Sequence, residues 1–133
     1  GNFVLMSYIA TNHFMRPQTK TNDPIENSMS ITTHPIIDWF HLNFSYHVEH
    51  HLFPKMNPYH APKIRALLIK KIGKRYVAPP HWKALLYLYL TPRVYKDADT
   101  LIDPDNLERT SSIEDITHAL AAPSTNQPPH FST

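Results

Sequence analysis

The chain has 133 residues, a formal net charge of +2 and no cysteine, so any metal that it binds must be held by donors other than thiolates. Its 13 prolines, a mean hydropathy of -0.40 and long polar stretches predict few residues for burial and an incomplete hydrophobic core. No run reaches the roughly 18 to 20 apolar residues that a membrane span needs, which excludes a complete span within this sequence.

The chain opens with an apolar stretch. Residues 2–15 are predicted to be helical, and Arg16-Pro17 ends this helix because the residue before a proline avoids the α region. Residues 3–10 within it fit either the tail of a membrane span or a short core helix. We favour the tail of a span.

A polar segment and a second helix follow. Residues 18–35 predict a loop, and residues 36–52 predict the helix that carries a group of histidines, ending before Pro54. Asn43 and Ser45 in its middle give it mediocre helix propensity, so packing and metal would have to stabilise it.

The segment from His50 to Lys96 contains ten lysines and arginines and no acidic residue. Residues 62–76 within it predict an amphipathic basic helix with a weak point at Gly73. This pattern suits a membrane surface, where anionic head groups contribute about 1 kcal/mol per Lys or Arg. A solvated face packed on the protein is the alternative, and nucleic-acid binding is disfavoured because no recognition motif accompanies the charge.

After Pro79-Pro80, residues 81–90 predict a further helix that is apolar nearly all round. It is too short to span a membrane. It either lies at the membrane interface, where Trp and Tyr are favoured, or covers the histidine group.

The end of the chain is acidic, with seven Asp and Glu against Arg109 alone from residue 97 onward. Residues 103–105 predict a turn or a helix start, and Ser111 or Ser112 is a suitable cap for a short helix through about residue 121. The last ten residues are predicted to be disordered.

His47, His50 and His51 lie within five positions. With about 100° of rotation per residue, one helix face offers all three nitrogens, because the second and third lie on either side of the first. Imidazole binds zinc, copper, iron and nickel without help from thiolates. The spacing therefore predicts a transition-metal site without choosing the metal, and a solvated histidine-rich turn is the alternative.

Residues 47–54 read HVEHHLFP, preceded by LNFSY and followed by KMNPYHAPKI. This run resembles the last of the three histidine boxes of the membrane fatty acid desaturases. The resemblance implies a membrane-embedded, mostly helical protein with a di-iron centre held by histidines from three boxes. It also implies insertion of a double bond into an acyl chain with molecular oxygen and external electrons.

The resemblance further implies that His47, His50 and His51 are iron ligands. His13, in the string ATNHF at the end of the first apolar stretch, is implied as a fourth ligand, with a structural histidine as the alternative.

The chain also departs from the family pattern, because two boxes are missing. Two irons need more nitrogen ligands than four histidines supply. We therefore expect the C-terminal part of a longer desaturase, inactive by itself, with the first two boxes upstream. The remaining histidines stand alone in the sequence: His34, His41, His60, His81, His118 and His130.

Polar neighbours of the box have open roles. Glu49 points about 160° from the midpoint of His50 and His51 on an ideal helix, so it either orients a ligand from another segment or pairs with a cation. Asn43, one turn before the box, is a candidate for holding a metal-bound water. His41 and Asp38 lie off the ligand face, which favours interfacial or capping roles.

The expected fold is all-α, comprising the C-terminal helices of a histidine-box integral-membrane desaturase with irregular loops and a disordered tail. Residues 1–15 are expected to be the end of a truncated membrane helix. Residues 16–96 are expected to be a cytosolic histidine-box region with basic interfacial helices, and residues 97–133 an acidic C-terminal tail. The box and the C-terminus are placed on the cytoplasmic side of a membrane.

The predicted function is fatty acid desaturation with two iron ions as cofactor and O2 as co-substrate. A related histidine-box lipid hydroxylase and a non-catalytic membrane-surface remnant are the alternatives. The expected partners are an acyl-lipid or acyl-CoA substrate, ferredoxin or cytochrome b5 as electron donor, and membrane lipid. Front-end desaturases typically have Gln at the first position of the last box, whereas this chain has His47. In this respect the chain resembles the other acyl-lipid or acyl-CoA desaturases more closely.

Overall fold

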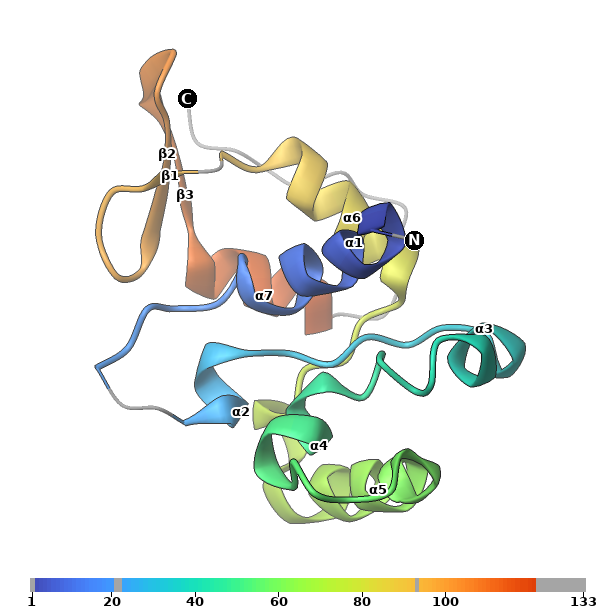
Figure 1. Ribbon diagram of the computed structural model, residues 1–133. Helices are drawn as coiled ribbons and strands as arrows, with labels where there is room; N and C mark the ends of the chain where they lie inside the picture. The colour runs from blue at the N-terminus through green and yellow to red at the C-terminus, as the bar shows by residue number, and fades with distance from the viewer. Residues whose placement is uncertain (1, 21–22, 93, 122–133) are drawn as a thin grey trace.

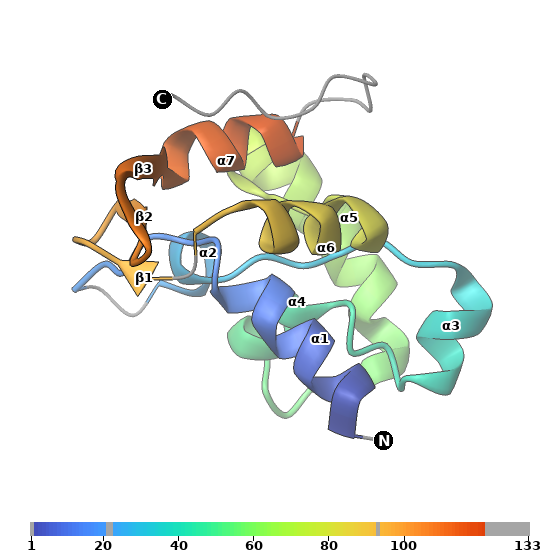
Figure 2. The same ribbon diagram turned by 90° about the horizontal axis from the view of Figure 1, so that it is seen from above.

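The computed structural model describes residues 2–20, 23–92 and 94–121. Helices α1 (Asn2–His13), α6 (His81–Leu90) and α7 (Ile113–Ala121) occupy one half of the molecule, and α4 (His47–Leu52) and α5 (Ala61–Ile72) occupy the other (Figure 1). The extended segment before α3 (Pro35–Phe40) runs between the two halves, and α3 projects at one end, as Figure 2 also shows. The short elements are α2 (Pro24–Asn27) and two 3-10 turns, Pro58–His60 and Gly73–Arg75.

A three-stranded antiparallel sheet overturns the expected all-α fold. Its strands β1 (Val94–Tyr95), β2 (Thr100–Asp103) and β3 (Asn106–Ser112) lie in the order β1-β2-β3. Leu101 in β2 is fully buried and pairs with both neighbouring strands. These strands were not predicted because the segment is acidic and lacks a long apolar pattern. Their stability depends instead on pairing with one another.

The sheet is fastened to the end of α1. The Tyr95 hydroxyl donates to the carbonyl oxygens of Phe14 and Arg16, the latter at 2.9 Å, and the backbone N–H of Gln18 donates to the Ala98 oxygen at 2.9 Å. The strand region therefore helps to fix the chain immediately after His13.

The predicted single helix over residues 36–52 is also wrong, because a turn divides it into α3 and α4. Leu42 and Asn43 in this turn have positive φ values of 51° and 58°, which no right-handed helix accommodates. Buried Asp38 accepts a hydrogen bond from the Ser45 hydroxyl across the turn. This local bond competes with continuation of the helix, as expected for Ser and Asp side chains.

Other sequence expectations agree with the observed elements. The helix over 81–90 is present, and the basic helix α5 ends where Gly73 adopts a φ of +53°. The predicted turn at 103–105 joins β2 to β3, and a short helix ends at residue 121. The first helix stops at His13, slightly earlier than expected.

A single apolar cluster joins α1, α6, α7 and the sheet. The buried cluster consists of Tyr8, Met15, Met29, Ile31, Val77, Ala84, Tyr87, Leu101, Ile113, Ile116 and Leu120.

Among the described residues, no helix has the length and apolar composition to cross a membrane. The predicted disorder of the last ten residues lies outside the described residues. The division into three regions stays a prediction.

Candidate metal centre

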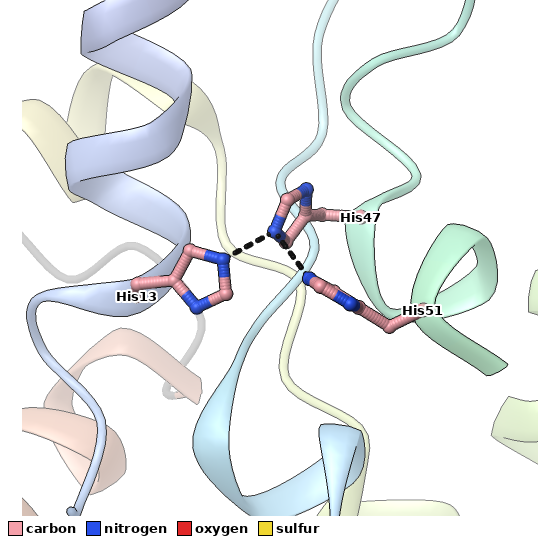
Figure 3. Close-up of side chains that lie close together, drawn as sticks. All are labelled: His13, His47 and His51. Atoms are coloured by element: carbon pink, nitrogen blue, oxygen red, sulfur yellow. Dashed lines mark hydrogen bonds between the residues drawn. The ribbon is translucent and has the colours of Figure 1, made fainter. Parts of the chain in front are cut away.

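Three imidazoles converge between α1 and α4 (Figure 3). The Nε2 atom of His47 lies 2.6 Å from Nε2 of His13 and 3.0 Å from Nε2 of His51. One ring nitrogen from each of the three side chains falls within 4.8 Å of the others. The three ring planes are inclined to one another by 75° to 85°, and one nitrogen of each ring faces the same small volume.

Helix geometry explains which histidines take part. His47 and His51 are four residues apart in α4 and so share one face, whereas His13 arrives from the last residue of α1. His50 is exposed and is not part of this group. The structure thus brings together three of the four predicted ligands, two of them from the box and one from 34 residues upstream.

The separations suit a bound ion. Two imidazole nitrogens that bind one ion at about 2.1 Å lie roughly 3.0 to 3.4 Å apart. The Nε2 atoms of His47 and His51 have this spacing. The distance between the Nε2 atoms of His13 and His47 must increase by about 0.4 Å to reach the lower end of the range. Without an ion, the short contacts are hydrogen bonds between ring nitrogens. In the tautomer that carries its proton on Nδ1, each Nε2 offers a lone pair to the same small volume, so the donor set fits a transition metal.

The environment of the box favours the neutral form of two imidazoles, those of His47 and His51. Burial, and then the neighbouring His13, His51 and His50, lower the pKa of His47 to about 3. Burial also lowers the pKa of His51, with His13 and His50 adding to the effect. Neutral imidazole is the form that binds metals, because protonation removes the lone pair.

A buried strap, residues 28–31, aligns the two halves of the cluster. The Met29 N–H donates to the carbonyl oxygen of Asn12, next to His13, at 2.9 Å. The Ile31 N–H donates to the Ser45 oxygen at 3.0 Å, and the Ser30 hydroxyl accepts from the Val48 N–H at 3.0 Å. The same strap therefore holds the residue before His13 and both sides of His47.

Glu49 pairs with a cation, one of the two roles left open by the sequence. Its carboxylate is fully buried and lies 3.2 Å from the Nε atom of Arg65 in α5. Sequence reasoning missed Arg65, which it grouped with the basic surface of α5, and also Ser30 and Tyr76, which complete the pair's surroundings. The only indication in the sequence is that Arg65 lies close to the apolar residues of α5. A long basic side chain next to an apolar face can extend toward the interior of the protein.

Asn43 does not contribute to the cluster, since its side-chain amide donates to the Pro58 oxygen at 3.1 Å. His41 and Asp38 serve α3 and its surroundings. His41 ends that helix and its Nδ1 lies 2.8 Å from the Tyr8 hydroxyl, whereas Asp38 lies in the first turn.

His47 and His50 also face a small cavity of about 160 Å³ on the side of the turn before α4. Its other lining residues are Leu42, Asn43, Phe44, Tyr46, Met56, Pro58 and Ala61. The cavity next to His50, the box histidine outside the cluster, is therefore lined by both polar and apolar atoms.

The sequence model of the fatty acid desaturase family matches residues 1–84, well over half of the chain. The chain belongs to the fatty acid desaturase family. The matched range contains every member of the histidine cluster, the strap and Arg65, and it ends within α6. No curated protein and no solved structure gives a significant match to the chain. The range that defines the family membership thus includes all three histidines of the cluster.

Proposed function

We propose that this chain supplies part of the iron centre of a fatty acid desaturase, an oxidoreductase that introduces a double bond into an acyl chain. The observation that carries the proposal is the convergence of His13, His47 and His51 on one ion-sized volume. Family membership supports iron as the metal.

His50 belongs to the same proposal as a ligand of a second iron. Its position beside the cavity next to His47, but outside the three-histidine cluster, supports a separate ion. Two irons need more donors than these four histidines, and no other histidines of the chain have ligand spacing. The remaining ligands are therefore proposed to come from two further histidine boxes that are not among the 133 residues.

When bound, iron supplies the activation of oxygen that removes hydrogen from an unactivated methylene group. The residues of this chain hold and orient the metal. His47 is 6% exposed, so solvent has little access to its ring. The low pKa of His47 keeps its lone pair available at neutral pH, and Phe44 lies beside it, with ring centroids 5.7 Å apart.

The substrate is proposed to be an acyl-lipid or acyl-CoA, with ferredoxin or cytochrome b5 as electron donor. We also propose a location at a membrane, with the box on the cytoplasmic side. Large exposed aromatic residues support this location, because Trp and Tyr are favoured at membrane interfaces. Those on α3 and α6 are Trp39, Phe40, Trp82 and Tyr89, at 60% to 76% exposed.

The test is expression of the complete coding sequence that contains this chain, followed by gas chromatography and mass spectrometry of cellular fatty acids. We expect new unsaturated acyl chains that disappear in His51→Ala and persist in His118→Ala, since His118 is exposed and distant from the cluster. Hydroxylated products would instead identify a lipid hydroxylase. Desaturation that survives His51→Ala would refute the proposed metal centre.

A further inference from the structure

Glu49 is the one carboxylate within the box, and it is completely buried. Its Oε1 atom lies 3.2 Å from Nε of Arg65, and the two side chains are 0% and 13% exposed. Buried charges are costly unless a partner and hydrogen bonds satisfy them. The ion pair therefore places a strict geometric demand on α4 and α5, the helices that carry it.

Both members of the pair are surrounded by further partners. The Tyr76 hydroxyl donates to Oε1 of Glu49, and the Ser30 hydroxyl donates to Oε2 at 2.6 Å. On the other side, Nη2 of Arg65 donates to two backbone oxygens, those of Ile31 at 3.1 Å and Ser45 at 3.2 Å. The guanidinium carbon also lies 3.8 Å from the centre of the Tyr46 ring.

These partners connect α4 to several of the segments around it. Ser30 and Ile31 belong to the strap that also binds the backbone next to His13. Tyr46 and Ser45 immediately precede α4, and Tyr76 follows the turn after α5. One guanidinium and one carboxylate thus join four separate stretches of chain around the helix that carries the histidines.

Helix α4 has little to orient it by itself. It contains only six residues, and Tyr46 at its start provides no side-chain cap. A helix of that length is not stable without tertiary contacts. On an ideal helix Glu49 lies about 160° from both His47 and His51, nearly on the opposite face. Fixing the Glu49 side chain therefore sets the direction in which both imidazoles point.

We propose that the Glu49–Arg65 ion pair is the positioning element that sets the rotation of α4 and thereby brings His47 and His51 to His13. Neither side chain is one of the three whose nitrogens converge, so both act through the histidines. The inference rests on the proposed metal centre, and it adds residues that the spacing of the histidines does not reveal.

The experiment is a titration of the 133-residue chain with Co²⁺ alone, followed by visible absorption. Cobalt reports both affinity and geometry, because its absorption bands depend on the arrangement of its ligands. The variants are Glu49→Gln and Arg65→Met, each of which removes one charge of the pair. Leu101→Ala is the matched control, since Leu101 is fully buried in β2 and lies outside the histidine cluster.

We expect Glu49→Gln and Arg65→Met to weaken Co²⁺ binding by about 10-fold to 100-fold, the range typical of residues that orient metal ligands. The spectrum at saturating Co²⁺ should also change in both variants. Leu101→Ala should lose stability but keep the wild-type affinity and spectrum. Arg65→Lys preserves the charge without the forked contacts and should give an intermediate affinity.

Wild-type affinity and spectrum in folded Glu49→Gln and Arg65→Met would overturn the positioning role while leaving the metal centre intact. Failure of the wild-type chain itself to bind Co²⁺ would instead overturn the metal centre, and the positioning role with it. If both charge variants fail to fold, Tyr76→Phe decides the question, because it removes the hydroxyl that bonds to both members of the ion pair and keeps both charges. Reduced affinity in Tyr76→Phe supports the positioning role, and unchanged affinity refutes it.

Discussion

At the scale of single residues, the neighbours His50 and His51 have different surroundings. His51 lies one turn after His47 and shares its nitrogen cluster, whereas His50 lies outside that cluster and faces the small cavity. Both side chains are exposed. The spacing of the box predicted a metal site but placed all three imidazoles on one face. The choice between them depends on how α4 is rotated by its buried contacts, which spacing does not record.

This difference predicts two distinct metal-binding results. In the 133-residue chain, His51→Ala should weaken Co²⁺ binding by more than the roughly 10-fold to 100-fold that loss of an outer partner costs. His50→Ala should leave that affinity nearly unchanged, because its ring is outside the cluster. Isothermal titration of both variants measures this, and equal losses would show that a single ion uses both histidines.

In the complete enzyme the same two substitutions should have the same effect on desaturation. Both His50→Ala and His51→Ala are expected to abolish desaturation, because the proposed second iron needs His50. Product analysis together with iron content checks this, with His118→Ala as the control. Full activity in His50→Ala would remove it from the proposed ligand set.

His81 predicts how stability depends on pH. Its Nε2 atom is buried without a hydrogen-bond partner, and burial, followed by the nearby His41, lowers its pKa. The unfolded chain therefore binds this proton more readily than the folded chain, with a pKa of about 6.5. The contribution to stability is complete above that pH and declines as the pH falls through it.

We therefore expect the free energy of unfolding, measured by denaturant titration without metal, to fall between about pH 7 and pH 5. His81→Phe should reduce this slope, and the exposed His118→Phe should preserve it. His47 and His51 also have lowered pKa values and contribute in the same direction. An unchanged slope in His81→Phe would contradict this assignment.

At the scale of elements, sequence reasoning succeeded where the local signal was strong. Helix α6 and the end of α5 follow directly from an apolar run and from Gly73. It failed for the 36–52 helix, because the backbone reversal at Leu42 and Asn43 depends on hydrogen bonds with buried Asp38 and with Pro58. The sheet was missed for a similar reason, since its strands are short and stabilised by pairing.

Gly73 allows a direct test of an element boundary. Its φ of +53° is unfavourable for residues with a side chain, although no atom lies within 4 Å of the position that a Cβ would occupy. Gly73→Ala should therefore lower stability by about 1 to 2 kcal/mol through backbone strain alone. Denaturant unfolding measures the loss, with exposed Lys74→Ala as the control. Equal stability of Gly73→Ala and the wild type would show that the turn relaxes easily.

At the scale of the whole molecule, the sheet contributes to the apolar core. Leu101 is fully buried in the same cluster as Ile113 and Tyr8. Composition correctly indicated a small core, since many large apolar side chains remain exposed on α3 and α6. It gave no indication that the acidic region would complete that core.

Leu101→Ala should consequently destabilise the whole chain by about 2 to 5 kcal/mol, the usual cost of a cavity at a buried leucine. Leu107→Ala on β3 is the control, because Leu107 is 71% exposed and should change stability by no more than about 0.5 kcal/mol. Thermal or denaturant unfolding followed by circular dichroism compares them. A small effect of Leu101→Ala on helix unfolding would mean that the sheet folds independently.

We propose that His13, His47 and His51 together bind one transition-metal ion. The most direct test is the Co²⁺ stoichiometry of the 133-residue chain, compared with that of His13→Ala and His47→Ala. We expect one ion per wild-type chain, held by imidazole nitrogens, and loss of that ion in either variant. Absence of binding in the wild type, or undiminished binding in both variants, would contradict it.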